Sequence, residues 1–332
     1  MFSSISETST VTPRQKMRGH TEPVRGVVHL PGGQRIMTCS MDGSLRLWDL
    51  ESSAQIGKDW RDDNNAKLRS IALSPNGKIV ASGGDDGKVR LWDVEMRKVV
   101  AKSTGRAHIV SALCWSADGE RLASGSWDGL ARVWDVDSGK TVLAIKTGHI
   151  LAWAVMYSPD SSKLATGGYK ENAVKIWDAK AGELLNTLEH SSMVRSLAWT
   201  SDGKKLISGS LGPIRIFDTA TWKQIAILQN DVEDDDTHFV NGISLSSNNR
   251  LLASASWDET ARLWNLDTNL QVGPPLKHKN YLNSVSLSRD GKVLATACQD
   301  ENAYMWDVHA ILKEAGLEDL LPIGTNFVSV NT

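Results

Sequence analysis

The chain has 332 residues, and its 37 Lys and Arg are balanced by 39 Asp and Glu, which gives a formal net charge of -2 at pH 7. This balance excludes an overall basic field, the usual electrostatic basis for binding nucleic acid or an anionic membrane. The three cysteines, Cys39, Cys114 and Cys298, form neither an even disulfide set nor a Cys-x-x-Cys zinc motif, so no metal site is expected.

The amino-terminal segment predicts a disordered tail. Residues 1–11 are polar and rich in Ser and Thr, and the first twenty residues lack the charged head and apolar core of a signal peptide. Further along the chain, no apolar stretch reaches the length needed to span a membrane. We therefore expect an intracellular protein, cytoplasmic or nuclear, with no membrane partner.

A Trp-Asp dipeptide, or a close variant of it, recurs at intervals of 40 to 47 residues. The seven copies are Trp48-Asp49, Trp92-Asp93, Trp134-Asp135, Trp177-Asp178, Phe217-Asp218, Trp264-Asn265 and Trp306-Asp307. A period near forty residues is typical of a radial array of four-stranded sheets. The third unit shows the parts, because residues 110–115, 122–126, 131–134 and 141–145 are strand-like runs separated by turn residues.

Recurring motifs make the chain similar to a known family over about residues 13–308. They are represented by Gly19-His20, Ser74-Pro75-Asn76-Gly77, Leu122-Ala123-Ser124-Gly125-Ser126, Asp128-Gly129 and Leu47-Trp48-Asp49. This pattern resembles the WD-repeat family of seven-bladed β-propellers. The resemblance implies an all-β fold, in which one seven-bladed propeller of four-stranded antiparallel blades occupies residues 12–308.

The resemblance also implies that an amino-terminal strand closes the ring. The sequence after Asp307 has helical spacing, so the last blade lacks an outermost strand of its own, and residues 12–18 would fill that place. Residues 309–332 are expected to form a short amphipathic helix and a tail. That helix would either cap the underside of the propeller or offer its apolar stripe to a partner.

Each repeat carries a hydroxyl at the same place, and in the family this hydroxyl links an indole to an imidazole and a carboxylate. We call these four side chains the relay. Two units have the whole set at regular spacing: His20, Thr38, Asp42 and Trp48, then His278, Thr296, Asp300 and Trp306. A Ser-His-Asp set can suggest nucleophilic catalysis, but a catalytic triad is needed once, with an exposed nucleophile and oxyanion donors. Copies within strands therefore indicate structure, and we expect neither an enzyme nor a cofactor.

Arginines and aromatic residues recur where the repeats meet the expected channel mouth. The candidate partner-binding residues are Arg25, Arg69, Arg195, Trp127, Trp153, Trp257, Phe239 and Tyr281. Arg and Trp are the residue types that dominate binding hot spots. One interpretation is a peptide platform with tryptophan walls and arginines that receive a carboxylate or phosphate. The alternative is that some of these residues merely plug the channel.

The functional prediction is a non-enzymatic scaffold or adaptor for a protein or peptide partner, within a larger complex. The alternative is a substrate-recognition subunit of a ubiquitin ligase or another regulatory complex, which would read an acidic or phosphorylated motif. The acidic run at residues 231–236 explains the longest interval between repeats and is expected to be a solvated loop.

Overall fold

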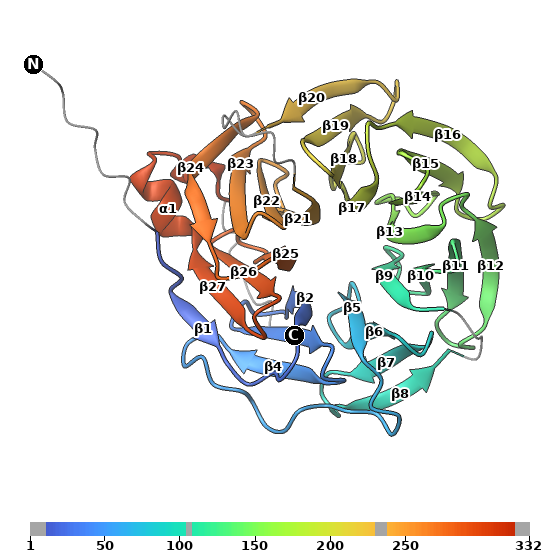
Figure 1. Ribbon diagram of the computed structural model, residues 1–332, viewed down its shortest axis with the longest axis horizontal. Coiled ribbons are helices and arrows are strands. Elements are labelled where there is room, and N and C mark those ends of the chain that lie inside the picture. The colour runs from blue at the N-terminus through green and yellow to red at the C-terminus, as the bar shows by residue number, and fades with distance from the viewer. Residues whose placement is uncertain (1–10, 104–107, 230–237, 323–332) are drawn as a thin grey trace, which may run out of the picture.

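The computed structural model describes residues 11–103, 108–229 and 238–322. Residues 1–10 of the predicted tail and the acidic run at 231–236 therefore lie outside the described residues. Seven small sheets surround a central channel, as Figure 1 shows. The predicted seven-bladed propeller is confirmed.

Each blade is an antiparallel meander that runs from the channel to the rim. Blade one contains β2 (Val24–His29), β3 (Arg35–Ser40) and β4 (Leu45–Asp49); blade two contains β5 (Leu68–Leu73), β6 (Ile79–Gly84), β7 (Val89–Asp93) and β8 (Lys98–Lys102). Blade three contains β9 (Val110–Trp115), β10 (Arg121–Ser126), β11 (Leu130–Asp135) and β12 (Thr141–Lys146). Blade four contains β13 (Leu151–Tyr157), β14 (Lys163–Tyr169), β15 (Ala173–Asp178) and β16 (Leu184–Glu189).

The remaining blades follow the same order. Blade five contains β17 (Val194–Trp199), β18 (Lys205–Ser210), β19 (Ile214–Asp218) and β20 (Gln224–Leu228). Blade six contains β21 (Val240–Leu245), β22 (Leu251–Ser256), β23 (Thr260–Asn265) and β24 (Leu270–Lys277). Blade seven contains β25 (Leu282–Leu287), β26 (Val293–Cys298), β27 (Ala303–Asp307) and, at its outer edge, β1 (Gln15–Met17).

The pairing of β1 with β27 closes the ring. The two strands are antiparallel, with Gln15 opposite Met305 and Met17 opposite Ala303. Met17 is buried in a cluster that joins blade seven to blade one. The predicted closure is therefore confirmed, and it joins segments from the two ends of the propeller in one sheet.

Blade one departs from the four-stranded pattern. Its three strands are followed by two isolated bridges, Trp48 to Gln55 and Leu45 to Trp60. Gly57 lies between them with φ of 75°, a left-handed conformation that interrupts an extended strand. The indole of Trp60 is buried and packs toward Trp92 of blade two, so side-chain packing supplements the shortened edge.

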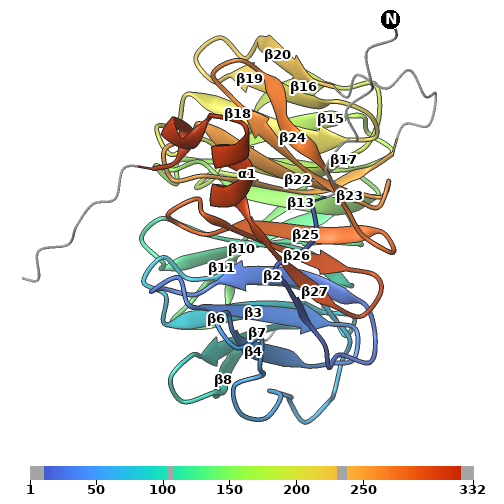
Figure 2. The ribbon, with the colours of Figure 1, turned by 90° about the vertical axis from the view of Figure 1, so that its left-hand side faces the viewer.

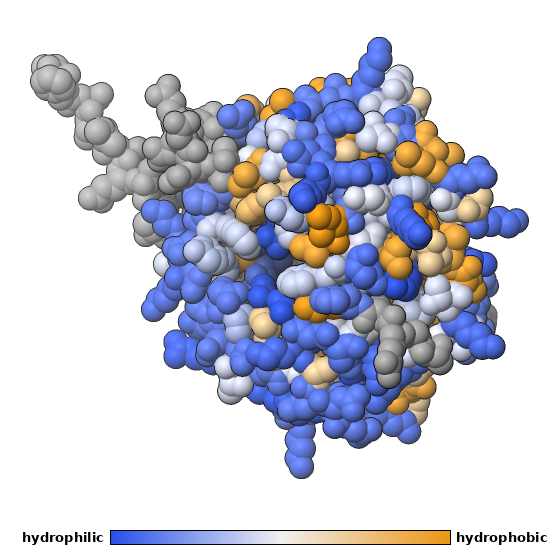
Figure 3. All heavy atoms as spheres, turned by 45° about the vertical axis from the view of Figure 1, so that its right-hand side comes forward, coloured by the Kyte–Doolittle hydropathy of each residue, from blue (hydrophilic) through white to orange (hydrophobic). Residues whose placement is uncertain are grey.

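The second strand of each blade is the most buried element. β10 reads RLASGS, and every residue after Arg121 is buried, because neighbouring blades cover both faces of the sheet. Small side chains suit this double packing. The outer strands are more exposed: Leu184 and Leu185 of β16 and Ile225 and Ile227 of β20 reach the surface. Figure 3 shows such apolar side chains as separate groups on a mainly hydrophilic face.

A short helix, α1 (Val308–Glu314), follows the last blade at the outer side of the ring (Figure 2). The side chain of Asp307 caps it by accepting a hydrogen bond from the backbone N–H of Ala310. The helix ends at Glu314; Gly316, two residues further on, has φ of 68°, and a 3-10 turn, η1 (Glu318–Leu320), follows. Ile311 and Leu312 are buried in the core cluster of blades six and seven, so the helix covers the propeller.

Among the described residues, no helix has the length and apolarity required to cross a membrane.

Candidate partner-binding site

The inner strand of every blade contains a β-bulge near its start, at the second residue in six blades and at the third residue in blade four. In β17, for example, Val194 pairs with Ser210 and Ser196 with Gly209, which leaves Arg195 without an opposite residue. A bulge adds one residue to one strand and re-aims its side chain. The bulge residues of blades one to seven are Arg25, Arg69, Ser111, Trp153, Arg195, Asn241 and Asn283.

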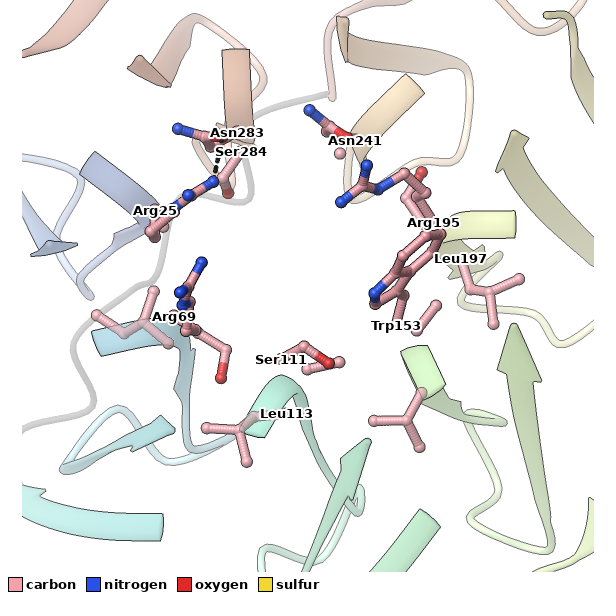
Figure 4. A pocket seen from close by; sticks show the side chains of 18 of the residues that line it. Arg25, Arg69, Ser111, Leu113, Trp153, Arg195, Leu197, Asn241, Asn283 and Ser284 are labelled. Atoms are coloured by element: carbon pink, nitrogen blue, oxygen red, sulfur yellow. Dashed lines mark hydrogen bonds between the residues drawn. The ribbon is translucent and has the colours of Figure 1, made fainter. Parts of the chain in front are cut away.

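These seven side chains line one cavity of about 260 Å³ in the central channel. Figure 4 shows Arg25 and Arg69 on one side of it and Arg195 and Trp153 on the other. The fold therefore presents one residue per blade at this place, and the sequence of each blade decides its chemistry. The predicted arginines and Trp153 do come together, from four different blades.

Arg195 occupies an aromatic cage, which we define by Trp153, Phe239 and Trp257. Its guanidinium carbon lies 4.4 Å from the ring centre of Trp153, 4.7 Å from Trp257 and 5.2 Å from Phe239. Burial, followed by the positive charge of Arg25, lowers the pKa of Arg195 to about 10, so it remains charged at neutral pH. Among the described residues, no carboxylate forms an ion pair with it.

The other two arginines are already engaged. Arg69 forms a two-pronged ion pair with Asp85, at 2.5 Å and 3.0 Å, and lies 5.4 Å from the ring of Trp127. Arg25 donates one hydrogen bond of 2.9 Å to the amide oxygen of Asn283. The three arginines are therefore not equivalent: Arg69 pairs with a carboxylate, Arg25 donates to a neutral amide, and Arg195 has neither an ion pair nor a side-chain hydrogen bond among the described residues.

Aromatic rings form a continuous wall beside Arg195. Trp257 contacts Phe239 edge-to-face, with ring centres 4.9 Å apart, and stacks on Tyr281 at 5.6 Å. Tyr281 is the most exposed of the three, at 47%. On the other side, Trp153 lies 5.6 Å from Tyr169, a residue that the sequence analysis did not assign to the site. Trp127 stands apart, next to Arg69 and His108.

Several buried donors at this mouth have no acceptor in the described part of the chain. They are Nε of Arg25 and the indole N–H groups of Trp127 and Trp153, and one acceptor, the amide oxygen of Asn241, is also unpaired. A buried polar group without a partner costs about 1–3 kcal/mol. The excess of donors makes the channel mouth chemically suited to an acceptor-rich or anionic group.

The relay is complete in blade one. Nδ1 of His20 lies 2.8 Å from the Asp42 carboxylate, Nε2 lies 2.8 Å from the Thr38 hydroxyl, and the Trp48 indole donates to the same hydroxyl at 2.8 Å. Burial opposes ionisation of Asp42, but hydrogen bonds from His20 and Ser44 outweigh it and hold its carboxyl pKa well below the usual value. All four side chains are enclosed, as expected for a structural role.

In blade seven the expected relay is wrong in one link, because His278 does not bind the carboxylate of Asp300. Nδ1 of His278 donates to the backbone oxygen of Leu276 at 2.9 Å, and Asp300 instead accepts from the Tyr304 hydroxyl. The remaining links are present: Nε2 of His278 lies 2.8 Å from Thr296, and the Trp306 indole lies 3.4 Å from the same hydroxyl. Tyr304 lies on β27, four residues after Asp300, and its hydroxyl therefore reaches the carboxylate that His278 was expected to bind.

That position four residues after the turn carboxylate is a pattern that the sequence analysis missed. Four blades place an arginine there, which pairs with the carboxylate: Asp42 with Arg46, Asp86 with Arg90, Asp128 with Arg132, and Asp258 with Arg262. The regular Asp-to-Arg interval was the signal that could have revealed it. The described residues contain no group of three His, Cys, Asp or Glu side chains placed to hold a metal ion.

The repeat family described as "WD domain, G-beta repeat" matches residues 11–49, 60–93, 99–135, 140–178, 182–218, 225–265 and 274–307. The chain belongs to the WD-repeat family. WD-repeat propellers are generally protein-interaction scaffolds.

Relatives of this WD-repeat chain match only part of it. It is 32% identical over 99 residues to the serine-threonine kinase receptor-associated protein of Gallus gallus, covering 30% of this chain and 27% of the relative. Identity is 30% over 100 residues to the poly(A)+ RNA export protein of Schizosaccharomyces pombe, covering 29% and 28%. It is also 30% over 99 residues to cell division cycle 20.5, cofactor of APC complex, of Arabidopsis thaliana, covering 30% and 22%. Each match spans under a third of the relative's own length.

Proposed function

We propose that this WD-repeat chain is a non-enzymatic adaptor that binds a partner peptide or protein at the channel mouth, within a larger complex. The observation that carries the proposal is the caged guanidinium of Arg195, which meets three aromatic rings and has no acidic partner in the described chain. Aromatic residues and arginine supply most of the binding energy in protein interfaces. The unpaired donors nearby add sites for acceptor groups of the partner.

The channel-plug alternative makes a different prediction. If these side chains only fill the mouth, substitutions there change stability and leave partner binding intact. If they form a platform, removing an aromatic wall removes a partner while the ring remains folded. Trp257→Ala is a suitable change because Trp257 contacts Arg195, Phe239 and Tyr281 together.

The experiment is affinity capture of the intact protein from its native extract, with mass spectrometry of the retained proteins. Parallel captures use Trp257→Ala, Arg195→Gln and Arg35→Gln. Arg35 is exposed at the start of β3 and lies outside the channel cavity, so its variant controls for loss of one positive charge. Partners retained by the parent and the Arg35 control but lost by the two mouth variants support the proposal. Equal retention by all four proteins, with unchanged thermal midpoints, contradicts it.

A second candidate is the reading of an acidic or phosphorylated motif by a regulatory complex, such as a ubiquitin ligase. The unpaired charge of Arg195 favours it, because a buried cation without a counter-ion gains most from an incoming anion. Treating the extract with phosphatase before capture distinguishes a phosphorylated partner from one that binds through a carboxylate. A phosphorylated partner is lost after phosphatase and on Arg195→Gln, whereas a carboxylate partner is lost only on Arg195→Gln. A partner that resists both changes rules out the anion-reading function.

A further inference from the structure

A second cavity, of about 450 Å³, opens between blades four and five. It is formed by the turn after β13, the end of β17 and the turns after β17 and β19. In an antiparallel meander, successive turns alternate between the two ends of the strands. These turns therefore lie at the end opposite to the histidine loops and the channel mouth. The cavity uses none of the residues assigned to the partner-binding site above.

Two tryptophans form one wall of this cavity. Trp199 ends β17, and Trp222 lies in the turn between β19 and β20. Their ring centres are 6.3 Å apart and their planes meet at 78°, an edge-to-face arrangement. Both rings are only partly buried, against the core of blades four and five. The wall therefore offers aromatic surface to the cavity and is also anchored from behind.

Trp222 adopts a backbone conformation that a tryptophan rarely adopts. Its φ is 57°, in the left-handed region, which costs an L-residue about 1–2 kcal/mol. The same turn position is left-handed in blades one to six: it is Gly139 and Gly182 in blades three and four, with φ of 63° and 73°, and Ser53, Arg97 and Asn269 in blades one, two and six, with φ of 60°, 57° and 60°. The left-handed backbone is therefore a property of the turn. What distinguishes blade five is the size of the side chain placed there, which is a reason to look for a function of Trp222.

Trp199 contributes an unused hydrogen-bond donor. Its indole nitrogen is buried and has no partner among the described residues. Trp115 occupies the same place at the end of the inner strand in blade three, and its indole N–H donates to the backbone oxygen of Ala72 at 3.1 Å. At the same strand-end position, the Tyr157 hydroxyl of blade four and Nδ1 of His29 in blade one are also buried without a partner among the described residues, so three blades share an unpaired polar atom at this place.

The cavity is lined by charged residues of both signs, so the lining favours neither an anionic nor a cationic ligand. Asp160 and Asp202 line it together with Lys163, and each carboxylate already accepts hydrogen bonds from its own turn. An unpaired indole N–H favours a ligand with an oxygen acceptor, and the edge-to-face pair of tryptophan rings favours a flat apolar group. A polyproline II segment supplies both, because its backbone carbonyls are unpaired and its proline rings pack on aromatic surfaces.

We propose that the cavity between blades four and five binds a proline-rich segment of a partner in the polyproline II conformation. Proline rings pack on Trp199 and Trp222, and a backbone carbonyl of the segment accepts the hydrogen bond of the Trp199 indole. This second site goes beyond the adaptor function proposed above and lies on the other face of the ring. It would let one chain hold two partners at once.

The test uses the full-length protein labelled with ¹⁵N and a capped decaproline peptide as the probe. We expect the indole N–H signals of Trp199 and Trp222 to shift saturably on titration. Trp222→Gly removes one ring and relieves the left-handed strain, so the variant should fold and bind about tenfold less tightly or worse. Trp199→Phe removes the donor and should also weaken binding. Trp115→Phe is the matched control and should bind like the parent.

Three outcomes would overturn this proposal. They are unchanged indole signals, equal affinity of the parent and Trp222→Gly, and equal binding of a capped Gly-Ser decapeptide, which would show that proline is not recognised. Arg195→Gln should leave decaproline binding unchanged. A failure at this cavity is therefore distinguishable from a failure of the channel-mouth proposal.

Discussion

Asp42 and Asp128 occupy the same turn position in blades one and three but have different surroundings. Each lies near the arginine four residues further on, but Asp42 is enclosed and bonded to His20 and Ser44, whereas Asp128 is partly exposed to solvent and has Arg132 as its ion-pair partner. Asp42→Ala leaves the His20 N–H unpaired in the interior, so we expect a loss of about 1–3 kcal/mol. Asp128→Ala should cost under about 1 kcal/mol. Urea unfolding of the two variants measures the difference, and equal losses would show that the relay adds nothing.

Buried histidines predict how the stability changes with pH. Burial lowers the pKa of His149, His190 and His278 to about 4 in the folded protein, from 6.5 in the unfolded chain. Between these values the unfolded state binds more protons, so the stabilisation is complete above pH 6.5 and is lost as the pH falls toward 4. Each histidine contributes at most about 1.4 kcal/mol per pH unit.

Urea midpoints at pH 7.5, 6.5, 5.5 and 4.5 check this expectation. His190→Gln should flatten the slope, because glutamine removes one of the titrating groups. The tautomer of His278 follows from the same geometry: Nδ1 carries the proton for the Leu276 oxygen, so Nε2 accepts from Thr296. A midpoint that is constant from pH 6.5 to 4.5 would contradict the neutral buried imidazoles.

At the scale of the element, β1 is a strand of three residues that closes a ring of seven blades. Deleting residues 1–18 exposes the edge of β27 and removes the buried Met17 from the junction of blades seven and one. Met17→Ala alone should cost about 2–5 kcal/mol, as for other buried large-to-small changes. The deletion should cost more and lower the thermal midpoint in one cooperative step. An unchanged midpoint in the truncated protein would show that closure does not depend on β1.

Elements differed in how well the sequence predicted them. The repeat interval and turn residues predicted the blades, the resemblance to the WD-repeat family implied the closure, and the helical spacing after Asp307 predicted α1. The missing fourth strand of blade one was not predicted, because it depends on the left-handed Gly57 between two bridges. The bulges were not predicted either. The periodic sequence shows which residue stands near the start of each inner strand, but not that this residue is skipped in the pairing.

Across the whole molecule, the sequence predicted where the site residues stand in the repeats but not which side chains they contact. The sequence placed Arg25, Arg69 and Arg195 at equivalent points of three blades. It did not show that Asp85 neutralises Arg69 while Arg195 meets only aromatic rings, because these contacts join different blades or different strands. The aromatic pair of Trp199 and Trp222 was missed for the same reason, since it joins a strand end to a distant turn.

The two proposed sites are connected by one strand, and this geometry predicts that they act independently. β17 carries Arg195 near one end and Trp199 at the other, about 13 Å away at about 3.3 Å per residue. Changes more than about 10 Å apart, without shared contacts, usually add in free energy to within about 0.5 kcal/mol. Arg195→Gln should therefore leave decaproline affinity intact, and Trp222→Gly should leave channel-mouth binding intact. Sedimentation velocity with a captured channel-mouth partner and the peptide together should show the ternary complex, and mutual exclusion of the two ligands would contradict an adaptor with two separate faces.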